Sequence, residues 1–185
     1  MKWLIASDIH GSAYYCRQLL EAYDREHADR LLLLGDILYH GPRNDLPREY
    51  APKEVIELLN ARKEDICCVR GNCEAEVDQM VLEFPVLADY CVIAEGTVMI
   101  YATHGHIYNE QNLPPLHIGD ILLHGHTHVP KCVVHEDKRY VCMNPGSVSI
   151  PKEDSWHGYM TLEQGEFLWK DFDGHVHLRY AMKKL

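Results

Sequence analysis

The sequence predicts an α/β fold in which helices flank a sandwich of two β-sheets. The first half of the chain alternates short apolar runs, which indicate strands, with longer segments of helical periodicity. After Pro85 the pattern changes to pairs of short strands separated by turn residues. We therefore expect a four-layer α/β/β/α arrangement that combines a mixed sheet with a mostly antiparallel second sheet.

The first half of the chain supplies the helices and most of the buried strands. Five short apolar runs predict strands at residues 3–6, 31–34, 66–69, 98–102 and 121–123. Residues 12–27 have apolar side chains at helical spacing, with Ser12 as the N-cap. Residues 52–62 form a second amphipathic helix with Pro52 in its first turn. Residues 76–83 predict a short third helix.

The second half of the chain predicts hairpins. Turn dipeptides such as Gln164-Gly165 separate the members of each pair. The expected strands are residues 86–94 with 97–103, 130–136 with 139–143, and then 157–163, 166–172 and 175–181. Neither a linker nor an internal repeat is visible, so we expect one domain over residues 1–185.

Composition excludes several classes of function. The net charge of -10 and the pI near 5.7 argue against the basic surface that stable nucleic-acid binding needs. The apolar stretch that begins at Trp3 ends at Asp8 and is too short for a signal peptide or a membrane span. The seven cysteines are odd in number and include no CxxC pair, so we expect neither a disulfide framework nor a paired-cysteine structural zinc site, and a reducing cytoplasm is the simplest setting.

Seven side chains of metal-ligand type follow the five predicted strands. They are Asp8, His10, Asp36, Asn72, His104, His126 and His128. Strand ends are where open sheets place their sites, and residues two apart in an extended segment project to the same side. Carboxylate, amide and imidazole ligands together suit transition metals better than Ca²⁺ or Mg²⁺. Mn²⁺ is the first choice, and Fe, Ni, Co and Zn stay open.

The motifs that contain these residues resemble those of a known family. They are Asp8-Ile9-His10-Gly11, Gly35-Asp36, Gly71-Asn72, Thr103-His104-Gly105-His106 and Gly125-His126-Thr127-His128. In order and composition they are similar to the signature of the calcineurin-like metallophosphoesterases. Residues 41–44 and 144–151 further resemble the small bacterial YfcE-type phosphodiesterases.

The resemblance implies a metallophosphoesterase sandwich with two divalent metal ions. One ion would take Asp8, His10, Asp36 and His128 as ligands. The other would take Asp36, Asn72, His104 and His126, so that Asp36 bridges the two. The implied reaction is hydrolysis of a small phosphodiester by in-line attack of a metal-bridging hydroxide. The residual charge of such a centre, a single positive charge, favours a diester monoanion as the substrate.

Four further residues are candidates for contact with the substrate or its leaving group. Arg43 follows the bridging Asp36 and is suited to stabilise charge on phosphate oxygens. Cys73 stands where larger relatives have histidine after the Gly-Asn pair, and a thiol is a poor general acid. We therefore expect weak activity on poor leaving groups, unless His106 or His40 supplies the proton.

Other functions stay open at this point. A metallophosphoesterase-like domain that binds proteins without catalysis is one alternative, and a phosphomonoesterase or nuclease is another. The expected partner is a small-molecule phosphodiester, with no membrane association. A homo-oligomer is left open, because tyrosine, tryptophan and leucine in the C-terminal hairpins are suited to cover a partner surface.

Overall fold

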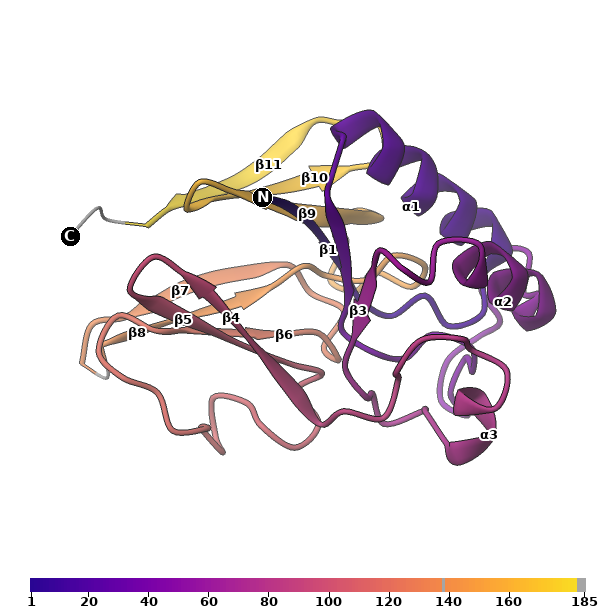
Figure 1. Cartoon of the computed structure of the whole chain (residues 1–185), viewed down its shortest axis with the longest axis horizontal. Coiled ribbons are helices and arrows are strands. Elements are labelled where there is room, and N and C mark those ends of the chain that lie inside the picture. The colour runs from indigo at the N-terminus through magenta and orange to yellow at the C-terminus, as the bar shows by residue number, and fades with distance from the viewer. Residues whose placement is uncertain (138, 183–185) are drawn as a thin grey trace.

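The computed structural model describes residues 1–137 and 139–182. Its core is a sandwich of two β-sheets, with the helices gathered on one side (Figure 1). No helix within these described residues is long and apolar enough to cross a membrane. The predicted combination of helices with two packed sheets is thus confirmed.

The first sheet has six strands in the order β11-β10-β9-β1-β2-β3. Strands β1, β2 and β3 run parallel, because helical connections carry the chain back between them. Strands β9, β10 and β11 extend the sheet as antiparallel hairpins from the other side of β1. The bounds are Lys2–Ala6 for β1, Arg30–Leu33 for β2, Ile66–Cys68 for β3, Gly158–Glu163 for β9, Glu166–Asp171 for β10 and Val176–Ala181 for β11.

The second sheet has five strands in the order β4-β5-β6-β8-β7. Its outer pairs are antiparallel hairpins, whereas β6 lies parallel to both β5 and β8. We expected this second sheet to be mostly antiparallel, but only half of its strand pairs are antiparallel. Antiparallel pairs form the majority in the first sheet instead. The bounds are Tyr90–Glu95 for β4, Val98–Thr103 for β5, Ile121–His124 for β6, Lys131–His135 for β7 and Tyr140–Asn144 for β8.

Helices α1 (Ala13–Glu26) and α2 (Pro52–Asn60) cover one face of the first sheet. Ser12 caps α1, since its hydroxyl accepts a hydrogen bond from the Tyr15 N–H at 3.3 Å. Helix α3 (Glu76–Gln79) is shorter than the predicted residues 76–83.

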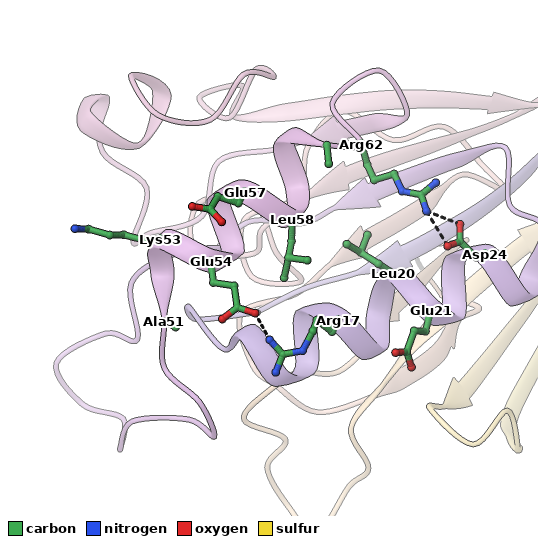
Figure 2. A pocket seen from close by; sticks show the side chains of 11 residues that line it. Arg17, Leu20, Glu21, Asp24, Ala51, Lys53, Glu54, Glu57, Leu58 and Arg62 are labelled. Carbon is green, nitrogen blue, oxygen red and sulfur yellow. Dashed lines mark hydrogen bonds and ion pairs between the residues drawn. The ribbon is translucent and has the colours of Figure 1, made fainter.

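Ion pairs join α1 to α2 across an open groove. Arg17 pairs with Glu54, and Arg62 with Asp24 (Figure 2). The side chains at this groove are mostly exposed or half-buried and carry both signs of charge. Such exposed pairs contribute little to stability, so burial of apolar side chains holds the helices in place.

Alternation along the strands divides the apolar side chains into two layers. Leu4 and Leu31 belong to the cluster beneath α1 and α2, whereas Ile5 and Leu32 belong to the cluster between the sheets. The outer face of the second sheet has a third, small cluster of Leu122, Tyr140, Cys142 and Leu116. Residues 104–120 cover this face without a helix among the described residues, which differs from the expected fourth helical layer.

Candidate metal centre

The seven predicted ligand residues come together where strands of both sheets end. Asp8 and His10 follow β1, Asp36 follows β2, and Asn72 follows β3. His104 follows β5, and the segment after β6 carries His126 and His128. The parallel strands β1, β2 and β3 end at one edge of the first sheet, and the parallel strands β5 and β6 end at one edge of the second. A hydrogen bond from His126 N–H to Asp8 Oδ2 at 3.1 Å joins the two edges. We call these seven residues the strand-end cluster.

Five residues of the strand-end cluster have positive φ. The values are 61° for Asp8, 50° for His10, 55° for Asp36, 68° for His126 and 62° for His128. Non-glycine residues in the left-handed region cost about 1 kcal/mol each, and such strain concentrates at functional sites. Backbone hydrogen bonds between the loops hold this conformation, including Asp8 N–H to the Gly35 carbonyl at 3.1 Å.

Two loop glycines make the close approach of the segments possible. A Cβ at Gly125 would lie 1.9 Å from the Ser7 hydroxyl oxygen. A Cβ at Gly71 would lie 2.2 Å from Asp36 Oδ1. Any larger residue at these two positions would push the ligand-bearing loops apart.

Backbone carbonyls orient three of the histidine rings. His10 Nδ1 donates to the Tyr39 carbonyl at 2.7 Å, His104 Nδ1 to the Leu34 carbonyl at 2.6 Å, and His128 Nδ1 to the Ile150 carbonyl at 2.6 Å. A carbonyl only accepts, so each Nδ1 carries the proton. In the neutral ring the Nε2 lone pair then points into the cluster, as in histidines that bind metals.

The inward-facing atoms form two groups that share Asp36. In the first group, His128 Nε2 lies 3.2 Å from His10 Nε2 and 3.2 Å from Asp8 Oδ1. His10 Nε2 is also 3.7 Å from Asp36 Oδ2. In the second group, His104 Nε2 lies 3.5 Å from Asp36 Oδ2.

The second group is completed by an amide and a third imidazole. His104 Nε2 lies 3.0 Å from Asn72 Oδ1 and 3.1 Å from His126 Nδ1. Burial, together with the charge of His104, lowers the pKa of His126 to about 4. A neutral imidazole with an available lone pair is the form that binds a metal.

The donor atoms of the first group are suited to a shared cation. Two Nε2 lone pairs cannot hydrogen-bond to each other, and within the described part of the chain the buried Asp8 Oδ1 has no hydrogen-bond partner. Although burial by itself raises the pKa of the Asp8 carboxyl, the interactions with His10 and His128 hold that pKa well below its usual range. A buried carboxylate beside converging imidazoles is the donor chemistry of a divalent transition metal.

Sequence reasoning missed two residues that support this cluster. Glu74 is buried and accepts hydrogen bonds from the backbone N–H groups of Asp36 at 2.9 Å, Ile37 at 2.8 Å and Gly71 at 2.5 Å. Burial and the charge of Asp36 raise the pKa of Glu74. Lys152 lies at the cavity beside the cluster. The one sequence feature that could have pointed to Lys152 is its place directly after residues 144–151, a segment that belongs to the family resemblance.

A cavity of about 460 Å³ opens at the strand-end cluster. Its lining includes two of the predicted substrate-contact residues, Arg43 and Cys73. The Cys73 thiol lies 3.4 Å from Asp36 Oδ2, and burial with the charge of Asp36 raises its pKa. His106 lines a neighbouring hollow of about 290 Å³ together with Asn72. His40 lines neither space.

A larger hollow, of about 890 Å³, lies elsewhere, in the groove between α1 and α2 (Figure 2). Its lining contains no residue of the strand-end cluster and is dominated by exposed, mutually paired charges such as Arg62 and Asp24. We place the chemistry in the smaller cavity, because converging donors and buried carboxylates identify a site better than volume does.

Comparison with known proteins agrees with this geometry. The model of the "Calcineurin-like phosphoesterase superfamily domain" matches residues 1–166. Phosphodiesterase YfcE of Escherichia coli K12 is 44% identical over 163 residues, which cover 88% of each chain. The solved structure of YfcE, described as a phosphoesterase from E. coli, superimposes with a TM-score of 0.93 at 40% identity, over 99% of this chain and 100% of that one.

A more distant structure shares the fold alone. Vps29 from Entamoeba histolytica, solved as a complex with Zn²⁺, is 20% identical with a TM-score of 0.60. The match covers 99% of this chain and 100% of that one.

Proposed function

Because the chain belongs to the calcineurin-like phosphoesterase superfamily, we propose that it is a phosphodiesterase that works with two divalent metal ions. The family and the identity to a named phosphodiesterase make it a metal-dependent phosphoesterase, and thus a hydrolase. One observation supports the dinuclear form above all. The inward-facing donor atoms form two groups, and Asp36 belongs to both.

One ion would be held by Asp8, His10, Asp36 and His128, and the other by Asp36, Asn72, His104 and His126. Oxygen and nitrogen donors in one set favour Mn²⁺, with Fe, Ni, Co and Zn as the alternatives. When bound, two such ions supply an activated water and neutralise charge on phosphate oxygens. The chain's own contribution is to orient the ligands, through carbonyl hydrogen bonds to the histidines and through Glu74.

Cationic side chains beside the cluster would bind the substrate phosphate. Arg43 and Lys152 line the same cavity as the ligand residues. A guanidinium presents several donors to phosphate oxygens, and an ammonium adds a point charge. The volume of about 460 Å³ suits a small molecule, and the net charge of -10 disfavours long nucleic acids. We therefore propose a small phosphodiester monoanion as the substrate.

The leaving group receives little help from this chain. Cys73 is the candidate proton donor that lies beside Asp36 in the cavity, and its thiol is a weak acid. His106 lines the adjacent hollow and His40 lines neither space, so neither borders the cavity that Asp36 and Cys73 share. We propose that leaving groups of low pKa depart without protonation, which makes aryl diesters better substrates than alkyl diesters.

All seven cysteines are free, which is consistent with a reducing cytoplasm as the place of action. All seven ligand side chains are present, which favours a working enzyme over a binding module.

The decisive experiment is a rate panel with metal-depleted protein to which Mn²⁺ is returned. We expect an aryl phosphodiester to be hydrolysed faster than the matching monoester, and only with added metal. Asp36→Asn should lower kcat/KM about 1,000-fold or more, since both ions lose a ligand. Asp24→Asn on α1 is the matched control and should keep wild-type rates. Equal rates with and without metal, or faster monoester turnover, would contradict the proposal.

A further inference from the structure

A second group of metal-binding atom types lies on the outer face of the five-stranded sheet. It consists of Glu110, His124 and Cys142, and one ligand atom from each residue lies within 4.8 Å of the other two. None of these residues belongs to the strand-end cluster. We call this group the outer-face cluster.

Strand pairing explains how two of its members meet. Strands β6 and β8 are parallel neighbours in which Leu122 pairs with Cys142. Leu122 and Cys142 share the outer apolar cluster, so both face away from the sandwich interior. His124 is two residues beyond Leu122 and therefore projects to the same outer face. His126 lies beyond the strand and joins the strand-end cluster instead.

The covering segment 104–120 supplies the third member. Glu110 is brought over the sheet, where β7 holds it from the side. Its Oε1 lies 2.9 Å from His135 Nε2, and its other oxygen pairs with the Lys131 ammonium. With these partners, one carboxylate oxygen lies within 4.8 Å of the ligand atoms of His124 and Cys142.

The His124 ring is oriented as a metal-binding histidine would be. Its Nδ1 lies 3.0 Å from the Gly125 carbonyl oxygen, which can only accept. Asn144 Nδ2 is a further neighbour at 3.5 Å, but its two hydrogens are engaged by the Gly125 carbonyl at 2.7 Å and the Thr127 hydroxyl at 3.1 Å. The proton therefore lies on Nδ1, and the Nε2 lone pair faces Cys142.

The spacing between sulfur and nitrogen suits a tetrahedral ion. Cys142 Sγ lies 3.4 Å from His124 Nε2. Zinc bonds of about 2.3 Å to sulfur and about 2.0–2.1 Å to nitrogen at a tetrahedral angle place the two atoms about 3.6 Å apart. The two ligands would thus need to move only by a few tenths of an ångström.

An unpartnered hydroxyl marks the same place. Tyr140 precedes Cys142 by two residues on β8 and shares its outer face. Its side chain is 2% exposed, and its hydroxyl has no hydrogen-bond partner among the residues that the structure describes. The ring stacks on His135 at 4.6 Å, beside the Glu110 carboxylate. A buried polar atom next to a thiol, an imidazole and a carboxylate is a place where a water molecule or an ion would bind.

We propose that Glu110, His124 and Cys142 bind a thiophilic divalent ion of the Zn²⁺ type, with His135 or a water molecule as the fourth ligand. Thiolate, imidazole and carboxylate are zinc donors, and Ca²⁺ and Mg²⁺ disfavour such a set. On binding, the Cys142 S–H proton goes to solvent and the sulfur bonds to the metal. The ion would tie segment 104–120 to β6 and β8. That segment begins with His104 and His106, so an ion bound at the outer-face cluster would also help to hold His104 in the strand-end cluster.

Cobalt substitution separates this site from the strand-end cluster. A Co²⁺–thiolate bond gives a charge-transfer absorption in the near ultraviolet, and Cys142 would supply that thiolate. We expect the band in the wild-type protein and its loss in Cys142→Ala. Cys132→Ala is the matched control, because Cys132 lies on neighbouring β7 but packs against the interior cluster. Cys73→Ala is a second control, because Cys73 borders the strand-end cluster. Both controls should keep the band.

Metal content provides an independent readout. Dialysed wild-type protein should retain one more Zn²⁺ per chain than Cys142→Ala, measured by mass spectrometry of the metal. Glu110→Gln avoids a change in the buried core and should weaken zinc binding about tenfold or more, with the protein still folded. The proposal is overturned if Cys142→Ala and Glu110→Gln both hold as much zinc as the wild type. It is equally overturned if the cobalt band disappears in Cys73→Ala and persists in Cys142→Ala.

Discussion

The Nε2 atoms of His10 and His128 face each other at 3.2 Å, while the Nδ1 atom of each ring donates to a backbone carbonyl. In the neutral rings neither Nε2 has a hydrogen to share, so the two lone pairs repel unless a proton or a metal ion lies between them. The carbonyls of Tyr39 and Ile150 hold the rings in this arrangement. The folded chain therefore holds these two imidazoles in a metal-binding arrangement, and a bound cation should stabilise the folded state.

Metal binding should accordingly raise thermal stability. At a free Mn²⁺ concentration of about 100 times Kd, the bound ion adds about 2.7 kcal/mol to the free energy of unfolding. For a chain of this size we expect a rise in Tm of roughly 5–10 °C, measured by differential scanning fluorimetry of chelator-treated protein. His128→Ala should lose most of this rise and Asp24→Asn should keep it. A rise of equal size in His128→Ala would show that the ion binds elsewhere.

Arg43 should act on the substrate and not on the metal. Arg43→Ala is expected to lower kcat/KM for an aryl phosphodiester by about 10- to 100-fold, because one charge-assisted contact to phosphate is lost. The affinity for Mn²⁺, measured by calorimetry, should stay within about twofold. Arg43→Lys is the matched variant and should recover part of the loss, because it restores charge without the planar guanidinium. Wild-type kinetics in Arg43→Ala would show that Arg43 does not contact the substrate.

An imidazole at position 73 should broaden the range of leaving groups. The Cys73 thiol is a weak acid beside Asp36, and burial raises its pKa further. We expect Cys73→His to increase kcat/KM about tenfold for alkyl diesters and to change aryl diesters little. Cys73→Ser is the control for loss of the thiol alone and should show no such gain. An unchanged ratio of alkyl to aryl rates in Cys73→His would weaken the proposed role of leaving-group acidity.

Glu26 should give the protein a distinct sensitivity to acid. Although burial alone raises the pKa of its carboxyl, hydrogen bonds from Lys170, Lys2 and Tyr159 lower it to about 2. Because the folded-state pKa lies below the unfolded value of about 4.3, this stabilisation is complete above about pH 5. It is lost progressively as the pH falls toward 2.

The test compares urea denaturation of wild type and Glu26→Gln between pH 7 and pH 3. We expect the variant to be less stable by about 2 kcal/mol at pH 7, with the difference shrinking as the pH falls. Glu21→Gln lies on the same helix at an exposed position and should follow the wild-type curve. A difference that stays constant across the pH range would show that lost packing, and not charge, is responsible.

Local patterns predicted much of this fold correctly. The helix that begins after Ser12 and the hairpin strands at 157–163 and 166–172 agree with α1, β9 and β10 within one or two residues. These elements depend on spacing along the chain, on a cap and on a turn, all of which are short-range features. The sheet to which each hairpin belongs was predicted less well, because β9 joins β1 through pairings more than 150 residues apart in sequence.

The sequence by itself determined the types of ligand and their placement after strands, because a strand and the polar residues that follow it lie within a few positions of each other. Only the tertiary structure decided which side chains share a space. Glu74 is a buried hydrogen-bond acceptor, Lys152 borders the cavity, and Glu110 meets Cys142 on the outer sheet face. Those contacts depend on strand order and on the face to which each side chain points, and these are set by packing between segments far apart in the chain.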